Sequence, residues 1–188
     1  MKSGYADAVL LARRKLDTIT DTRLICERTG VKWSGGDYLI PWFGEERKLS
    51  SGNEAEQILW LHYITAEGTK NPTGEWIPYR DVPGARFYEP NFTARAMRPI
   101  VKRFGADPGG LVRAGALIGA RSAEAGEAAI TLDLLPHLPV MYILWGGDGE
   151  FEPRGQILFD KTAPGWLPAE DLVVLASLGA YKLVSLKV

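Results

Sequence analysis

A histidine interrupts an otherwise apolar stretch of the chain, residues 58–64. The neutral imidazole of this residue, His62, can ligate a metal ion or the iron or cobalt of a tetrapyrrole, or act as a general base. The alternative is a core histidine with both ring nitrogens hydrogen-bonded, which is the usual arrangement of buried polar groups. His62 is therefore the first candidate for a metal-binding and cofactor-binding residue.

Four further candidate cofactor-binding residues lie in a segment rich in aromatic rings and proline. They are Trp76, Tyr79, Arg80 and Tyr88. Arginine offers a planar fork of donors that suits a carboxylate or phosphate, and aromatic rings supply flat apolar walls. Together the four side chains can line a ligand pocket. In the alternative, Arg80 bonds carbonyl groups of its own loop while the rings fill the core.

Acidic residues gather near position 150, where Asp148, Glu150 and Glu152 share one face if the chain is extended. Asp160 follows on the next expected strand. Clustered carboxylates can bind a hard cation or perform acid–base chemistry, so Asp148 and Glu150 join the candidate cofactor-binding residues. A calcium loop needs more oxygen ligands and a characteristic glycine and glutamate, which are missing here. A solvated turn is therefore the favoured alternative.

The remaining reactive side chains are weaker candidates. Cys26 can act as a nucleophile, but an inert buried thiol is the favoured interpretation. His137 lies between Pro136 and Pro139 in an expected exposed connection, where it would be a second axial ligand only if His62 were the first. The glycines form neither a P-loop nor a dinucleotide-binding motif, so nucleotide binding lacks its usual signature.

Composition narrows the classes of function. The net charge is -1, so the chain lacks the excess of basic residues that nucleic-acid binding needs. The basic cluster at 98–103 is interpreted as a solvated helix face. One cysteine excludes an internal disulfide or an iron–sulfur cluster and fits a reducing compartment. The N-terminus lacks the apolar core of a signal peptide, and no apolar run is long enough to span a bilayer. We therefore expect a cytoplasmic protein without nucleic-acid or membrane partners.

Helical periodicity and capping signals indicate where the candidate residues are held. Helices are expected over 5–17, from a cap at Asn53 to about Glu67–Gly68, over 93–104 with a bend or break at Pro99, and from Pro168 onward. The second of these helices carries His62 and is apolar on most sides, so it should be buried on most sides.

Two or three short strands are expected among residues 23–26, 31–33 and 38–40, with a turn at 35–37, and further strands over 128–135, 140–145 and 156–159. Residues 136–139 connect the two longest, and 184–188 suggest an edge strand. With no repeat and no linker, residues 1–188 are predicted to form one globular α+β domain. Its sheet should be mostly antiparallel and packed with three to five helices.

Several motifs together suggest a family. They are LHY at 61–63, GEWIPYRDVPG at 74–84, WGGDGEF at 145–151, LFD at 158–160 and LPAEDL at 167–172. In these segments the chain resembles an uncharacterised family of domains of unknown function from anaerobic bacteria and archaea. Some members are fused to, or encoded beside, iron–sulfur or corrinoid-metabolism proteins. The resemblance runs from the second expected helix to the end of the chain and implies no established activity.

Three classes of function remain open. The first is an accessory protein that binds a small molecule or cofactor, with a corrinoid or haem as the sharpest hypothesis and a metabolic protein as its partner. The second is a protein-interaction module without a ligand. The third is a hydrolase or lyase that uses His62 with Asp148, Glu150 or Asp160. We rank them in this order, because the sequence contains no recognised catalytic triad, metal motif or nucleotide loop.

Overall fold

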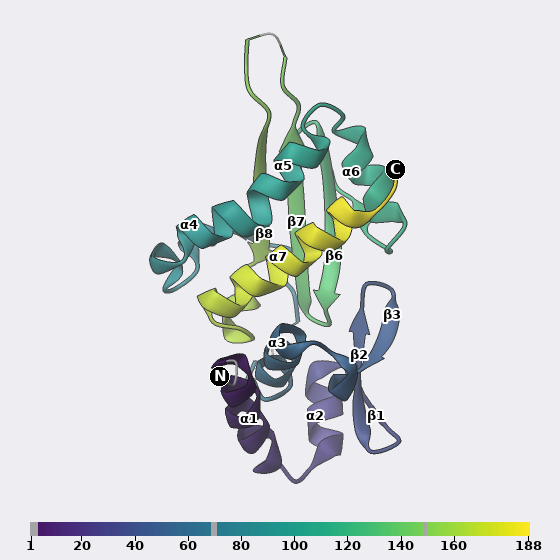
Figure 1. The fold of residues 1–188 in the computed structure, drawn as a ribbon, viewed down its shortest axis with the longest axis vertical. Helices are drawn as coiled ribbons and strands as arrows, with labels where there is room; N and C mark the ends of the chain where they lie inside the picture. Colours follow the sequence, from purple (N-terminus) through teal and green to yellow (C-terminus); the bar gives the residue numbers. More distant parts are fainter. Residues whose placement is uncertain (1–3, 69–70, 149) are drawn as a thin grey trace.

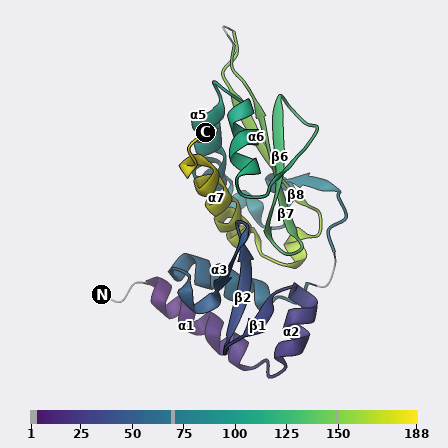
Figure 2. The same ribbon diagram turned by 90° about the vertical axis from the view of Figure 1, so that its right-hand side faces the viewer.

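The computed structural model describes residues 4–68, 71–148 and 150–188. These residues form a single-domain α+β fold, as predicted, with helices packed against two antiparallel sheets rather than one. The smaller sheet lies at one end of the molecule with the N-terminal helices, and the larger sheet lies at the other end (Figure 1). The helices of the C-terminal part cover one face of the larger sheet (Figure 2).

The N-terminal part of the chain is built from short elements. They are α1 (Gly4–Asp17), α2 (Thr22–Thr29), β1 (Lys32–Ser34), β2 (Asp37–Trp42), β3 (Glu45–Lys48), the 3-10 turn Leu49–Ser51 and α3 (Glu54–Ile64). The sheet order is β1-β2-β3, and the predicted hairpin turn is confirmed, because Gly35 and Gly36 both adopt positive φ. Helix α1 packs along α3.

The strand expected at residues 23–26 is wrong, because these residues belong to α2. The side chain of Asp21 caps the helix by accepting hydrogen bonds from the backbone N–H groups of Arg23 and Leu24. Gly30 ends it in the left-handed conformation, with a φ of 72°. Only Ile25 and Thr29 are buried, one helical turn apart. So narrow a buried stripe, of which only Ile25 is apolar, gives a weak helical periodicity in the sequence.

Helix α3 begins as predicted. Asn53 and Glu56 form a complete capping box, in which each side chain accepts a hydrogen bond from the other residue's backbone N–H. The helix ends at Ile64, before the expected stop at Glu67–Gly68. Thr65 follows as the C-terminal cap, and its hydroxyl donates to the Leu61 carbonyl at 2.8 Å, which satisfies an acceptor of the last turn.

The next segment, expected as a packed loop, contains short regular pieces. They are β4 (Trp76–Pro78), the 3-10 turns Tyr79–Asp81 and Ala85–Phe87, α4 (Glu89–Phe92), the π-helical turn η4 (Thr93–Met97) and α5 (Arg98–Phe104). The disturbance expected at Pro99 appears as this π turn, in which the Arg98 N–H bonds to the Thr93 carbonyl. Proline has no N–H to donate and its ring crowds the carbonyl four residues earlier, so a wider preceding turn relieves the conflict.

The larger sheet has the order β4-β8-β7-β6-β5, with every neighbouring pair antiparallel. Its remaining members are β5 (Arg121–Ser122), β6 (Ala128–Leu135), β7 (Leu138–Trp145) and β8 (Arg154–Asp160). The connection between β6 and β7 is shorter than predicted: the turn holds Pro136 and His137, the latter at a φ of 65°, and Leu138 already pairs in the sheet.

Two helices complete the layer on this sheet, α6 (Gly109–Ala116) and α7 (Ala169–Ser185), with the 3-10 turn Ala163–Gly165 before α7. The edge strand expected at 184–188 is wrong, because α7 continues to Ser185. Helix α7 approaches β7 so closely that a Cβ at Gly179 would lie 2.2 Å from the hydroxyl of Tyr142. A larger residue at position 179 would therefore force the helix away from the sheet.

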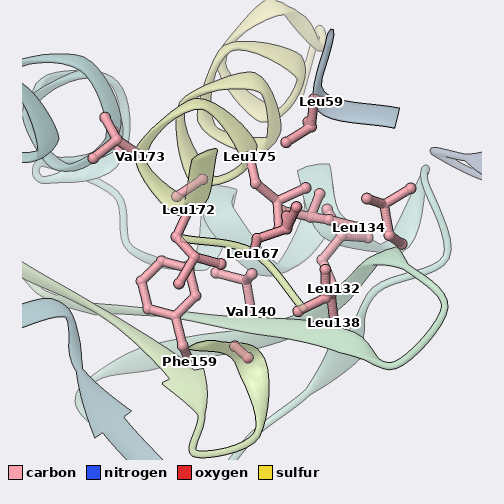
Figure 3. Packing of buried hydrophobic residues seen from close by; sticks show 14 of the residues in the cluster. Leu59, Leu132, Leu134, Leu138, Val140, Phe159, Leu167, Leu172, Val173 and Leu175 are labelled. Carbon is pink, nitrogen blue, oxygen red and sulfur yellow. The ribbon is translucent and has the colours of Figure 1, made fainter. Parts of the chain in front are cut away.

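One hydrophobic core runs through both parts of the molecule. Figure 3 shows Leu172 and Leu175 of α7 over Leu132 and Val140 of the sheet, with Leu59 of α3 beside them. These side chains are all buried. Within the described residues, no helix is both long and apolar enough to cross a membrane. The shared core fixes α3 against α7, and this contact positions the candidate site.

Candidate functional site

His62 is paired with a carboxylate that the sequence did not single out for chemistry. Its Nδ1 lies 2.7 Å from Oδ2 of Asp171. The His62 side chain is 41% exposed, so it is not walled in by the core as the alternative interpretation required. Its other ring nitrogen, Nε2, has no hydrogen-bond partner within the part of the chain that the structure describes. Nε2 is therefore available to a ligand, a metal ion or a proton.

The start of α7 places Asp171 opposite His62. Pro168 is extended, α7 begins at Ala169, and Asp171 lies in its first turn with a side chain only 9% exposed. Acidic residues stabilise the positive N-terminal end of a helix, which accounts for Glu170 and Asp171 at this place. The same geometry turns the Asp171 carboxylate toward the polar edge of α3.

His62 lines a cavity of about 540 Å³ between helices, which we call the His62 pocket. Helices α1, α3, α4 and α7 and the π turn η4 all contribute to its wall. The apolar lining residues are Ala8, Ala55, Ile58, Leu59, Val173 and Val174. The polar lining residues are His62, Tyr88, Asn91, Arg95, Glu170 and Asp171. An apolar cavity with a few convergent polar groups is the usual form of a small-molecule site.

The neighbours of His62 shift its titration upward. The hydrogen bond to Asp171 raises the pKa of His62, burial opposes this shift, and the charges of Asp171 and Glu170 add to it. Lys15 of α1 acts in the opposite direction. The net direction is a pKa above the ordinary value, so a larger protonated fraction is present near neutral pH.

We predict that His62 titrates above pH 6.5 in the folded protein and that Asp171→Asn lowers this midpoint. The pair stabilises the fold fully below the pKa of an unfolded histidine, and this stabilisation is lost as the pH rises through the folded pKa. Histidine-ring NMR titrations of the wild type and of Asp171→Asn measure the two midpoints. Identical His62 midpoints in the wild type and Asp171→Asn would refute the pairing.

Of the four residues expected to line one pocket around Arg80, only Tyr88 lines the His62 pocket. Its hydroxyl donates to Oε2 of Glu170 at 3.2 Å, and the charge of Glu170 raises the pKa of Tyr88. Tyr79 is buried instead: it stacks on Phe92 at 4.2 Å, and its hydroxyl donates to the Ala169 carbonyl. Tyr79 thus ties this loop to the first residue of α7.

Trp76 and Arg80 lie outside the His62 pocket. Trp76 is half-buried in β4, where it pairs with Asp160 of β8. The Arg80 side chain is 73% exposed, with Nε 3.9 Å from the Asp81 carboxylate. The 3-10 turn Tyr79–Asp81 explains the separation, because it turns Tyr79 into the core and Arg80 toward solvent. The expected single pocket of rings around Arg80 is therefore not formed.

The acidic residues expected to work with His62 lie elsewhere. Asp148 and Glu150 are exposed in the hairpin between β7 and β8, and Gly149 between them lies outside the described residues. Asp148 accepts hydrogen bonds from the backbone of Glu150 and Phe151, which lowers its pKa. This is the geometry of a solvated turn. Over the described ranges, no three or more His, Cys, Asp or Glu side chains are placed to hold a metal ion together.

Asp160 is a structural carboxylate. It is fully buried and accepts backbone hydrogen bonds from Thr73, Gly74 and Thr162, at 2.7–2.9 Å, and from the hydroxyls of both threonines. Burial alone would raise the pKa of Asp160, but these hydrogen bonds outweigh it and lower the pKa. All the acceptor capacity that would serve catalysis is used to hold the loop around Thr73 against β8.

Cys26 and His137 have surroundings typical of structural residues. Burial raises the pKa of the Cys26 thiol, which disfavours the reactive thiolate. The His137 ring stacks on Trp166, with centroids 5.2 Å apart and planes 12° from parallel. Trp166 also lines a second cavity, of about 520 Å³, together with Glu67, Gly68, Thr73, Lys161, Thr162 and Gly165. Neither Cys26 nor His137 lines the His62 pocket.

Sequence reasoning missed Asp171, Glu170, Arg95 and Asn91 as site residues. Glu170 and Asp171 carried a signal, since acidic residues follow Pro168, but it indicated only a helix start. His62 and Asp171 are 109 positions apart in the sequence. No spacing rule predicts a contact between helices that are so far apart along the chain. Arg95 had no local signal beyond its place on a helix face.

The fold and the site define a single-domain α+β protein with a His–Asp pair in an interhelical pocket. The chain belongs to the family described as domain of unknown function DUF3786, whose model matches residues 21–182. This confirms the resemblance to a domain of unknown function, and the match includes His62, Arg95 and Asp171. No curated protein and no solved structure matches the chain.

Proposed function

We propose that this protein binds a small molecule or cofactor in the His62 pocket and serves a metabolic partner protein as an accessory factor. The observation that carries the proposal is the free Nε2 of His62 beside a cavity of about 540 Å³. We also propose that the protein is cytoplasmic, because a chain with a single cysteine is compatible with a reducing compartment.

Asp171 prepares His62 for this role. With the proton of the neutral imidazole on Nδ1 and donated to Asp171, Nε2 is a lone-pair acceptor held in one orientation. Histidines that ligate metals usually donate their other N–H to a carboxylate or carbonyl in this way. The pair therefore supports a corrinoid or haem as the specific ligand, whose cobalt or iron Nε2 of His62 would hold.

We predict that haemin or aquacobalamin, added to the purified protein, shifts its absorption spectrum in the manner of histidine ligation. His62→Ala should lose this shift while the far-UV circular dichroism stays unchanged. His137→Asn is the matched control, because it removes the other histidine and asparagine tolerates the left-handed backbone at that position. Unchanged spectra with both compounds would contradict the tetrapyrrole proposal.

A second candidate function is proton-transfer catalysis, and the His62–Asp171 pair favours it. A carboxylate that holds the imidazole by Nδ1 leaves Nε2 as a general base, which is how histidine is oriented in many hydrolases. This retains the hydrolase or lyase hypothesis, with Asp171 in place of Asp148, Glu150 or Asp160. A rate of 4-nitrophenyl acetate hydrolysis that rises with pH through the His62 pKa and disappears in His62→Ala would support it.

A further inference from the structure

The charged side chains that line the His62 pocket differ in whether they have a hydrogen-bond partner. Asp171 is engaged by His62 and Glu170 by the hydroxyl of Tyr88. Arg95, in contrast, makes no hydrogen bond and no ion pair with any residue of the described ranges. The pocket thus presents one arginine whose donors are all available. A guanidinium binds carboxylate and phosphate groups with two parallel hydrogen bonds, so it is suited to an anionic group of a ligand.

The backbone that carries Arg95 is unusual. Arg95 is the central residue of the π turn η4, closed by the hydrogen bond from the Arg98 N–H to the Thr93 carbonyl. Single π turns within α-helices occur often at functional sites. The turn η4 packs against α7, and Arg95 lines the same cavity as Glu170 and Asp171 of that helix. The π turn therefore contributes an arginine to a pocket that α3 and α7 also line.

Positive charge continues from the pocket along the same helix. Residues 85–104 contain five arginine or lysine residues and one acidic residue, a local charge of +4 in a chain whose net charge is -1. Arg98 and Lys102 follow Arg95 by three and seven positions; both are exposed and neither is in an ion pair within the described part of the chain. Such a stripe raises the local concentration of anions along the helix that carries Arg95.

The rest of the pocket wall suits an apolar body. Ile58 and Leu59 of α3 lie on one side and Val173 and Val174 of α7 on another. A ligand that fills this space and reaches Arg95 must combine an apolar or aromatic body with a negatively charged end. A neutral apolar molecule would leave the arginine unpaired, and a small inorganic anion would leave the apolar wall exposed to water.

We propose that Arg95 is the anchor for the anionic group of the ligand, so that the His62 pocket selects apolar molecules bearing a carboxylate or phosphate. This inference rests on the proposed function, because it names the ligand class of the same pocket. It adds a specificity residue, on η4, that acts on the ligand directly.

The test compares three probes with the same ring system: 2-naphthyl phosphate, 2-naphthoate and the neutral 2-naphthol. Each is titrated into the wild type, Arg95→Ala and Arg113→Ala, followed by protein NMR at pH 7. Arg113→Ala is the control, since Arg113 is exposed, pairs with Asp107 and lies outside the pocket. We expect at least one anionic probe to bind about tenfold more tightly than 2-naphthol in the wild type and Arg113→Ala, and this advantage to vanish in Arg95→Ala.

The outcomes separate the two proposals. Equal affinity for all three probes, with signals of the pocket residues shifted in every protein, would overturn the role of Arg95 and leave the binding pocket intact. No shift of pocket signals with any probe would overturn both. A preference for the phosphate over the carboxylate, or the reverse, would identify which anionic group the site takes. Circular dichroism checks that each variant is folded.

Discussion

Replacing Asp160 with alanine is expected to lower the free energy of unfolding by about 3–5 kcal/mol, because the change removes the acceptor shared by the donors of Thr73, Gly74 and Thr162. The carboxylate is fully buried and receives the backbone N–H groups of Thr73, Gly74 and Thr162. Without it the buried N–H and hydroxyl groups of Thr162 lose their acceptor, and the loop at Thr73 and Gly74 loses its attachment to β8. Urea-induced unfolding of the wild type and the variant measures the difference.

The matched control is Asp133→Ala, which removes an exposed carboxylate paired with Arg121 and should cost about 1 kcal/mol or less. The pKa of Asp160 is lowered, so its contribution is present above the unfolded aspartate pKa of about 3.9 and is lost as the pH falls through the folded pKa. The wild type should therefore lose more stability in acid than Asp160→Ala. Equal costs of the two substitutions would refute the structural role of Asp160.

The second large effect is expected at Trp60, whose replacement by alanine should lower the free energy of unfolding by about 3–5 kcal/mol. The side chain is 0% exposed, and its ring meets Trp42 edge to face at a centroid distance of 5.3 Å. A Cβ at Gly52 would lie only 2.5 Å from the Trp60 ring, so the cavity left by alanine is bounded by close neighbours. Thermal or urea unfolding checks the value.

Trp60→Phe should cost much less than Trp60→Ala, since it keeps a ring in place and the indole N–H of Trp60 has no partner within the described residues. Trp33→Ala is the control for loss of a tryptophan as such, because Trp33 is 46% exposed and lies in the short strand β1. An effect of Trp33→Ala as large as that of Trp60→Ala would contradict the packing described here.

Local signals in the sequence were sufficient for most elements and failed where the decisive partner is distant. The capping box at Asn53 and the glycine turn at 35–36 involve neighbouring residues only, and both were predicted correctly. Helix α2 was predicted as a strand. Only Ile25 and Thr29 of this helix are buried, so its sequence shows little helical periodicity, and the helical signal lies in its capping residues instead. The end of α7 was misjudged, because alternation over five residues also fits the last turn of an amphipathic helix.

The candidate site was predictable in part. An isolated polar residue in an apolar helix is visible in the sequence, and His62 does lie beside a cavity. Its partner Asp171 belongs to another helix, and tertiary packing alone brings the two within 2.7 Å. The aromatic segment supplied Tyr88 to the pocket and Tyr79 to the core, and two successive 3-10 turns that composition does not indicate lie between them.

Carbethoxylation of the two histidines by diethyl pyrocarbonate, located by peptide mass analysis, tests the central claim most directly. The reagent modifies an unprotonated ring nitrogen, so a free Nε2 at the His62 pocket should react in the folded protein. Haemin or 2-naphthyl phosphate, at saturating concentration, should slow the reaction severalfold at His62 and leave His137 unaffected. If His62 reacts only after unfolding, or at the same rate with and without both compounds, the pocket is not a ligand site of the kind described.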